Sequence, residues 1–234
     1  GKTMLLKRLP SILPDLSWGE AVESMALASL IPGNHGRSLS YQRPFRAPHH
    51  TISYAGMVGG GTNPLPGEIS LAHNGILFLD ELPEFQPQVL DSLRQPLETG
   101  EAVIARVQHR IAYPARFQLV AAMNPCRCGR ATEPGYACRK APNATCMAQY
   151  QSRISGPFLD RIDLVIEVPA VAATDLIAPM TSEPSTIIAR RVFAARARQA
   201  ERYEAFGLGA ETVNATCPVG LLDQTAPLDE AGIS

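Results

Sequence analysis

Apolar residues along the chain form two nearly continuous runs and one periodic run, a combination typical of an α/β protein. Residues 75–79 are uninterrupted apolar sequence that ends in two acids, so they predict a fully buried parallel strand. Residues 117–123 predict a second buried strand, and the amide of Asn124 after it can hydrogen-bond a phosphate or a water without adding negative charge. Ser17 and Glu20 have capping-box spacing, which predicts a helix ending near residue 30.

The segment between these elements has a different character. Residues 34–71 are rich in Gly, Pro, Ser and His and show no clear periodicity, which is typical of a functional insertion or of disorder. The segment includes His49 and His50, but these residues and His73 lack the spacing of a metal site, so non-metal roles are favoured.

Two further patterns follow the first apolar run, at residues 82–98 and 101–116. Residues 82–98 are helix-like but interrupted by three prolines. The segment 101–116 predicts a β-hairpin whose exposed end carries Arg106, His109 and Arg110. These basic side chains are therefore candidates for contact with an anionic partner.

Composition restricts the class of protein. The 234 residues are 45% hydrophobic and 18% charged, values typical of a soluble globular protein with one to two domains. Its apolar runs are too short to span a bilayer, so no membrane partner is expected. Five cysteines are too few for a secreted disulfide scaffold and no signal peptide is recognisable, so the expected location is the cytoplasm.

Charge is unevenly distributed, although 21 basic and 22 acidic side chains nearly cancel. Residues 101–161 hold nine Lys or Arg against three Asp or Glu, and residues 32–67 hold three arginines and no acid. Eighteen of the 21 basic residues are arginine, which favours planar, bidentate phosphate contacts. A polyanionic partner and the codon bias of a GC-rich genome remain alternative explanations of this excess.

The opening tripeptide carries the first candidate chemistry. Gly1, Lys2 and Thr3 fit the end of a phosphate-binding loop whose earlier glycines and strand would lie upstream, so the chain is expected to be a fragment. The tripeptide alone is a weak signal, but Asp80 and Glu81 strengthen it. Magnesium needs a hard carboxylate beside the loop threonine, and a hydrolytic water needs a base; these two acids provide both.

Four cysteines form a second candidate site. Cys126, Cys128, Cys138 and Cys146 have the spacing C-x-C-x9-C-x7-C within a basic segment. Four thiolates around one zinc ion would stabilise a loop with little apolar content, whereas unliganded thiols are the equally open alternative. Cys217 stands apart in the sequence and is expected to pack as a small hydrophobic residue.

The order of these residues resembles that of the Mg-chelatase-like branch of the AAA+ ATPases, in the ComM/YifB group of bacterial proteins. The resemblance extends from residue 1 to about residue 203. Its most specific pieces are residues 43–50 (RPFRAPHH), 66–75 (PGEISLAHNG), the acidic pair at 80–81, 117–125, and 155–163 (SGPFLDRID).

The fold implied by the resemblance is α/β: a P-loop AAA+ core with a parallel sheet flanked by helices. It includes a second-helix insertion at residues 43–67, a pre-sensor β-hairpin at 101–116 and the start of a helical lid. The expected domains are a core at 1–169 with a Cys-rich insertion at 126–146, a linker at 170–186, and a truncated lid at 187–234 that begins with a helix to about residue 203.

The resemblance also implies roles, residue by residue. Binding of ATP and Mg²⁺ falls to Gly1, Lys2, Thr3 and Asp80. Hydrolysis falls to Glu81 as the Walker B base, Asn124 as the first sensor, and Arg161 as the arginine finger given to a neighbouring subunit. Nucleic-acid contact in a central pore falls to Arg106, His109 and Arg110.

The expected function is that of an ATP-dependent, ring-forming motor, a homohexamer acting on DNA as a helicase or branch-migration enzyme in natural transformation or recombination. One alternative is an ATPase that remodels a protein partner, as a magnesium-chelatase subunit does. Another is a non-hydrolysing, zinc-stapled binding module, which Glu81 disfavours because a passive binder has no use for a catalytic acid. The upstream Walker A glycines, a Lon-like N-terminal domain and most of the lid are missing, so the fragment is expected not to hydrolyse ATP unaided.

Overall fold

The computed structural model describes residues 2–33, 38–61, 64–105, 110–131, 136–138, 142–168, 183–209, 212–225 and 227. The chain divides into two compact units. The first comprises Gly1–Pro10 and Asp15–Pro179, and the second comprises Ser11–Pro14 and Met180–Ser234.

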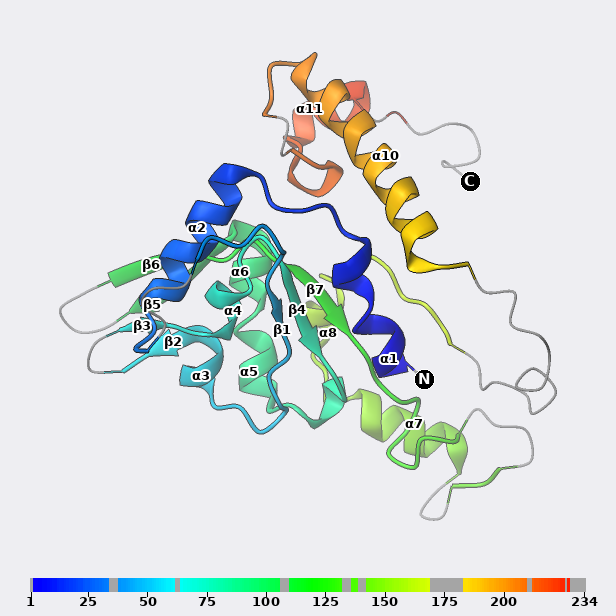
Figure 1. Cartoon of the computed structure of the whole chain (residues 1–234). Helices are drawn as coiled ribbons and strands as arrows, with labels where there is room; N and C mark the ends of the chain where they lie inside the picture. The colour runs from blue at the N-terminus through cyan, green and yellow to red at the C-terminus, as the bar shows by residue number, and fades with distance from the viewer. Residues whose placement is uncertain are drawn as a thin grey trace. The chain divides into compact units, whose positions relative to one another are not determined.

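A three-stranded parallel sheet, counted over the described residues, lies at the centre of the first unit (Figure 1). Its order is β1 (Phe45–Arg46), β4 (Ile76–Leu79) and β7 (Gln118–Ala121). Every residue of β4 is buried, as expected for a continuous apolar run in the middle of a parallel sheet. The parallel sheet and both strands predicted from the apolar runs are confirmed.

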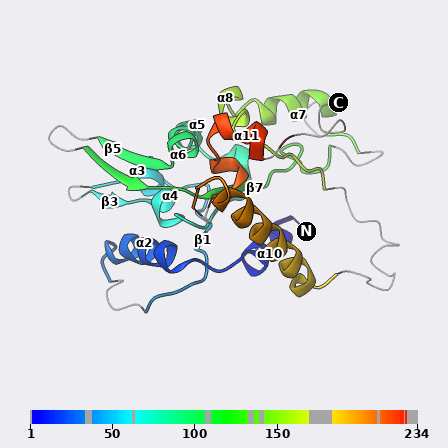
Figure 2. The ribbon, with the colours of Figure 1, turned by 90° about the horizontal axis from the view of Figure 1, so that it is seen from above.

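Helices cover both faces of this sheet (Figure 2). On one side lie α1 (Lys2–Leu6) and α2 (Trp18–Ser29). On the other lie α5 (Pro87–Asp91), α6 (Arg94–Thr99) and α8 (Gly156–Leu159). The capping box predicted for α2 is present, because the Ser17 side chain accepts from the Glu20 backbone N–H and the Glu20 carboxylate accepts from the Ser17 N–H.

The hydrophobic core fills the space on one side of β4. Leu77 and Leu79 belong to it and alternate with Ile76 and Phe78, which are buried on the opposite face. Further core residues come from α3 (Tyr54–Val58), α4 (Glu68–Leu71), α5 and α8: Met57, Val58, Ile69, Val89, Leu90 and Phe158. A well-packed core therefore supports β4 and the residues that follow it.

Residues 34–71 differ from the sequence expectation, because part of the segment belongs to the central sheet. Phe45 pairs with Ile76, and the Ile76 N–H donates to the Pro44 carbonyl at 2.8 Å. A side chain at Gly75 would place its Cβ 2.1 Å from that carbonyl oxygen, so the close approach of β1 requires glycine there. The pairing depends on this contact rather than on local periodicity.

In the described parts of the chain, two antiparallel strand pairs accompany the parallel sheet. The first joins β2 (Gly59–Gly60) to β3 (Leu65–Pro66), and the second is the predicted hairpin of β5 (Glu101–Ala105) and β6 (Arg110–Pro114). The Tyr113 hydroxyl donates to the Pro64 carbonyl at 2.8 Å and holds β6 against the smaller pair. The hairpin tip, with Arg106 and His109, lies outside the described residues.

Three short helical elements remain in the first part of the chain and after β7: η1 (Leu9–Ile12), η2 (Leu82–Glu84) and α7 (Asn143–Gln151). In the second unit, α10 (Ser185–Glu204) is followed by η3 (Asn214–Thr216) and α11 (Val219–Thr225). The predicted helix at 187–203 is thus confirmed as part of α10. Tyr203 is fully buried and its hydroxyl donates to Asn214 Oδ1 at 2.7 Å, which fixes the end of α10 against η3.

None of the helices in the described ranges has the length and apolar character needed to traverse a bilayer.

Candidate functional site

The first candidate site lies at the carboxyl ends of the parallel strands β4 and β7, next to the start of α1. This end of the sheet is its carboxyl edge. The Thr3 hydroxyl donates to Asp80 Oδ2 at 2.8 Å, although the two residues are 77 positions apart. The Lys2 ammonium donates to the Met123 carbonyl, just beyond β7, at 2.9 Å. The structure therefore brings Lys2, Thr3 and Asp80 together at this edge.

The backbone around Glu81 holds the acidic pair in place. Glu81 has φ 54° and ψ 47°, in the left-handed region that is uncommon for a residue other than glycine. Its backbone N–H donates to Asp80 Oδ1 at 3.0 Å, so both oxygens of Asp80 accept hydrogen bonds. The next N–H, that of Leu82, donates to the Ala122 carbonyl at 3.0 Å and attaches the turn to β7.

His50 is a neighbour of Glu81 that the sequence pattern did not indicate. Its Nδ1 lies 3.6 Å from Glu81 Oε2, and the Glu81 side chain is 54% exposed. The His50 ring packs at a tilt against His49, with ring centroids 4.0 Å apart, and makes a T-shaped contact with Phe85. Recognising β1 would have revealed this position, because residues that follow parallel neighbouring strands emerge at the same sheet edge.

The remaining predicted site residues were assigned to nucleotide or nucleic-acid contact and occur at several positions in the fold. Asn124 is exposed directly after Met123, whose carbonyl accepts from Lys2. Arg161, after α8, forms an ion pair with Glu98 of α6, and its Nε donates to Glu98 Oε1 at 2.7 Å. Arg110 is exposed at the start of β6. Gly1 lies outside the described residues, as do Arg106 and His109.

A buried histidine, His73, lies near the amino ends of β4 and β7, at the opposite end of these strands from Asp80. His73 Nδ1 accepts from the Arg116 N–H at 3.0 Å, so the proton is on Nε2, which donates to Glu23 at 3.1 Å. Burial lowers the pKa of His73 despite the Glu23 carboxylate. The hydrogen bond from His73, with one from Asn74 and the charge of Arg116, lowers the pKa of Glu23. His73 is therefore a neutral link between α2 and the entrance to β7.

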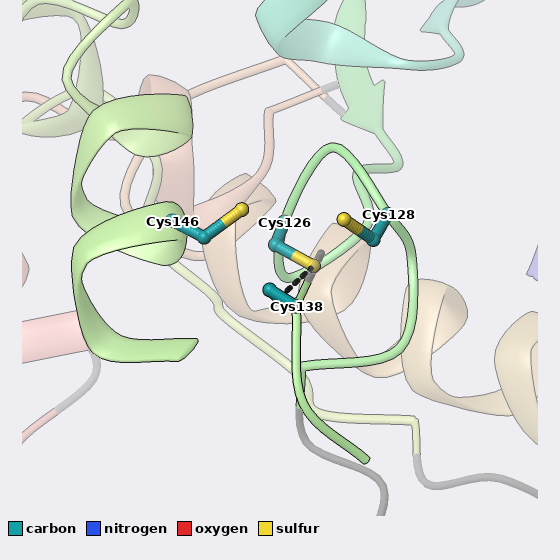
Figure 3. Close-up of side chains that lie close together, drawn as sticks. All are labelled: Cys126, Cys128, Cys138 and Cys146. Atoms are coloured by element: carbon teal, nitrogen blue, oxygen red, sulfur yellow. Dashed lines mark hydrogen bonds between the residues drawn. The ribbon is translucent and has the colours of Figure 1, made fainter. Parts of the chain in front are cut away.

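The second candidate site contains the four cysteines (Figure 3). Their sulfur atoms all lie within 4.8 Å of one another, and Cys126 Sγ is 3.8 Å from Cys138 Sγ. In Figure 3 the Cys146 side chain projects from α7 toward the loop that carries the other three. Cys126 is buried, and all four are free thiols. The predicted grouping of these cysteines is confirmed.

Hydrogen bonds to the sulfur make Cys126 unusual among them. Burial alone raises the pKa of Cys126, but backbone N–H groups of Ala131, Arg130 and Cys128, together with the Cys138 thiol, outweigh it and lower the pKa to about 7. Burial and the other three cysteines raise the pKa of Cys138. Cys217, in the second unit, is buried with its sulfur 3.6 Å from the Thr225 hydroxyl.

Comparison with known proteins assigns the chain to a family. Residues 1–176 match the family described as magnesium chelatase, subunit ChlI. The chain belongs to the Mg-chelatase family. This match includes both the carboxyl-edge site and the four-cysteine site.

Within the Mg-chelatase family the chain is similar to the ComM/YifB group, as the sequence resemblance implied. It is 51% identical over 203 residues to YifB of Escherichia coli, covering 86% of this chain and 39% of YifB. It is 56% identical over 169 residues to competence protein ComM of Haemophilus influenzae, covering 72% of this chain and 32% of ComM. The chain therefore spans about two fifths of the length of YifB and one third of that of ComM.

Among solved structures, a chain from a complex between the magnesium-chelatase subunits BchI and BchD is similar at a TM-score of 0.44 and 19% sequence identity. The similarity covers 90% of this chain and 68% of that chain.

The donor atoms of this Mg-chelatase family member fit magnesium at the carboxyl edge. Thr3 Oγ1 and Asp80 Oδ2 are hard oxygen ligands, of the kind that Mg²⁺ shares with phosphates, and they already lie 2.8 Å apart. The ammonium of Lys2 supplies a positive charge beside them. Glu81 offers a half-exposed carboxylate one residue farther along. The arrangement can hold a metal-bound phosphate chain next to the Glu81 carboxylate.

Proposed function

We propose that the protein is an ATPase of the Mg-chelatase-like AAA+ group, acting as a cytoplasmic, ring-forming motor on DNA. The observation that carries the ATPase proposal is the hydrogen bond from Thr3 to Asp80, with Lys2 and Glu81 beside it. Magnesium-dependent phosphoryl transfer requires a phosphate-loop hydroxyl and a strand-end carboxylate beside each other, so that both can hold the ion on the phosphates.

Glu81 is the proposed base for the attacking water. Its side chain is half-exposed, so water can reach the carboxylate, while its backbone is fixed by the hydrogen bond to Asp80. His50, 3.6 Å from the carboxylate, is the group that positions it. Bound magnesium would neutralise charge on the phosphates, and the protein would orient the water.

Arg161 is the proposed arginine finger for the neighbouring subunit of a homohexamer. Its partner within the chain, Glu98, is itself about half-exposed, so the pair can open without removing a charge from a buried environment. The Ser155 hydroxyl donates to Asp91 at 2.7 Å and anchors the start of the segment that carries Arg161 to α5. Arginine in that role stabilises the charge that develops on a transferred phosphoryl group.

DNA is the proposed substrate of the motor. Arg110 is exposed on the β5–β6 hairpin, and the surrounding sequence is strongly basic. The similarity to a protein named for competence agrees with a role in DNA processing. Remodelling of a protein partner predicts a different outcome, namely ATP turnover that single-stranded DNA leaves unchanged.

The proposed domain arrangement follows the same function. An ATPase core at residues 1–169, with a Cys-rich insertion at 126–146, would be followed by a linker at 170–186 and the start of a helical lid at 187–234. The 20-residue helix α10 and its contacts with η3 support a helical second domain.

Substitution of the base in the intact protein tests the ATPase. Glu81→Gln should bind ATP and Mg²⁺ with wild-type affinity and release phosphate about a hundredfold or more slowly, because an amide cannot accept the proton of water. Glu84→Gln is the matched control, since Glu84 pairs with Arg153 rather than facing Asp80. Wild-type phosphate release by Glu81→Gln would overturn the assignment. Turnover with and without single-stranded DNA distinguishes the two substrates.

A further inference from the structure

The spacing of the four cysteine sulfurs matches that around one metal ion. A tetrahedral zinc site with bonds of about 2.3 Å places its sulfur ligands about 3.8 Å apart. Cys126 Sγ and Cys138 Sγ are separated by 3.8 Å, and no pair among the four exceeds 4.8 Å. We propose that Cys126, Cys128, Cys138 and Cys146 together bind one structural zinc ion. This ion is separate from the magnesium of the nucleotide site.

The geometry disfavours the other states that four cysteines can adopt. A disulfide requires sulfur atoms about 2.05 Å apart, far less than the 3.8 Å between Cys126 and Cys138. A four-iron cluster attaches each thiolate to a different iron and so needs wider spacing than one shared ion. A single small cation that accepts four thiolates therefore fits best, and zinc is the common ion with that preference.

The loop has little else to stabilise it. Among the described residues between 126 and 146, only Cys126 and Ala131 are buried. Hydrophobic burial therefore contributes little to its folding, and Arg130 stacked on Tyr136, 4.6 Å from the ring centroid, is a surface contact. A metal ion bound by four ligands would supply the missing folding free energy.

Asn143 is the positioning residue of this site. Its side-chain oxygen accepts from the Cys138 N–H at 2.8 Å, and its amide donates to the Ala131 and Tyr136 carbonyls at 3.0 and 2.7 Å. One side chain thus satisfies three backbone groups of the loop. Because Asn143 is the first residue of α7 and Cys146 is three residues later, it fixes Cys138 relative to the helix that carries Cys146.

The position of the site suggests what the ion does. Cys126 follows Asn124 by two residues at the end of β7, whereas Cys146 lies on α7, which precedes the segment with Arg161. The ion therefore joins the end of β7 to α7. Given the proposed ATPase, this link would hold Asn124 at the carboxyl edge, where the Met123 carbonyl accepts from Lys2.

Metal analysis of the intact protein, purified without added metal or chelator, tests the site independently of any ATPase activity. We expect about one zinc per chain, lost in Cys128→Ser and in Cys146→Ser but retained in the control Cys217→Ser. Less than about a tenth of an equivalent of metal in wild type would overturn the proposal, as would iron in place of zinc.

A second measurement covers the case in which a cysteine variant fails to fold. Replacing zinc by cobalt in the wild-type protein should give the visible absorption of a tetrahedral, thiolate-bound ion. Asn143→Ala should still bind the metal but release it to a competing chelator about ten- to a hundredfold more readily, whereas Asn214→Ala, in the second unit, should not. An octahedral cobalt spectrum would contradict the four-thiolate site. Unchanged metal release from Asn143→Ala would contradict the positioning role of Asn143.

Discussion

The carboxyl-edge site and the four-cysteine site are built by opposite means. At the carboxyl edge, Asp80 follows a strand whose four residues are all buried, and a packed core presents the side chain. At the cysteine site, the described loop has two buried residues, and one asparagine side chain organises its backbone. The first site is positioned by the fold, whereas the second is positioned by its own polar contacts.

The difference indicates that the two sites respond to different perturbations. At the carboxyl edge, removing a side chain that binds the metal changes binding but leaves the surrounding fold intact. Removing a ligand from a loop that its metal helps to fold changes the structure of the loop. Chelation, substitution and pH should therefore affect the two regions to different extents.

Chelation should affect the two sites very unequally. Treating the intact protein with a strong zinc chelator should speed amide hydrogen exchange about a thousandfold in the loop around Cys126 and Cys138, because the proposed metal supplies most of its folding free energy. Exchange in β4 should not change, since the core cluster that contains Leu77 and Leu79 includes no described residue of the loop. Mass spectrometry of peptic fragments measures both regions. An equal increase of the exchange rate in β4 and in the loop would contradict the proposal that only the loop depends on the metal.

Substitution of Thr3 should change binding without disturbing structure. Thr3→Val keeps the shape of the side chain but removes the hydroxyl that donates to Asp80, so magnesium-dependent ATP affinity should fall about a hundredfold. Thr3→Ser, which keeps the hydroxyl, is the control. Titration calorimetry with and without magnesium provides the comparison. Equal ATP affinity in Thr3→Val and Thr3→Ser would contradict the proposed role of the hydroxyl.

His73 should make stability depend on pH. Its pKa is lowered in the folded protein from an ordinary value of 6.5, so the unfolded chain binds the proton more readily and the folded state loses free energy as the pH falls through 6.5. Glu23, whose pKa is lowered from 4.5, adds stability that is lost at still lower pH. His73→Gln should cost about 1–3 kcal/mol at pH 8 and flatten the decline between pH 7 and 5.

Urea unfolding at several pH values measures this effect, and Gln42→Ala, at an exposed position, is a control for substitution alone. A pH dependence that survives unchanged in His73→Gln would show that other groups cause it.

The smallest effect is expected at Arg161. Glu98→Gln removes the partner of Arg161 within the chain. Because both side chains are partly exposed to solvent, the unfolding free energy should change by no more than about 1 kcal/mol. Arg161→Ala should similarly leave stability intact but reduce ATP turnover in the assembled protein. Mixing Arg161→Ala with Glu81→Gln should partly restore turnover if subunits share sites. Thermal unfolding and phosphate release measure the two properties, and a large loss of stability in either variant would assign Arg161 a structural role instead.

The sequence predicted those features that depend on neighbouring residues. The apolar run before Asp80 and the capping box at Ser17 both act within a few residues, so their elements were predicted correctly. The two-residue strand β1 was missed because it depends on the close approach that Gly75 allows, 30 positions from Phe45. The position of His50 was missed with it.

At the cysteine site, the sequence predicted the grouping but not its organiser. The spacing of the four thiols was sufficient to suggest a cluster. Asn143 gave no sequence signal, because its partners are backbone groups of a loop up to 12 positions away. Such contacts depend on the tertiary path of the chain, which residue types alone do not specify.

The left-handed backbone of Glu81 places stability and the proposed ATPase activity in opposition at one position. A side chain in that conformation costs on the order of 1 kcal/mol, a cost that glycine would avoid. Selection for thermal stability alone would therefore replace Glu81, whereas selection for the proposed ATP turnover would retain it. Laboratory evolution under these two pressures would diverge at this residue, even though it is half-exposed and contributes nothing to the core.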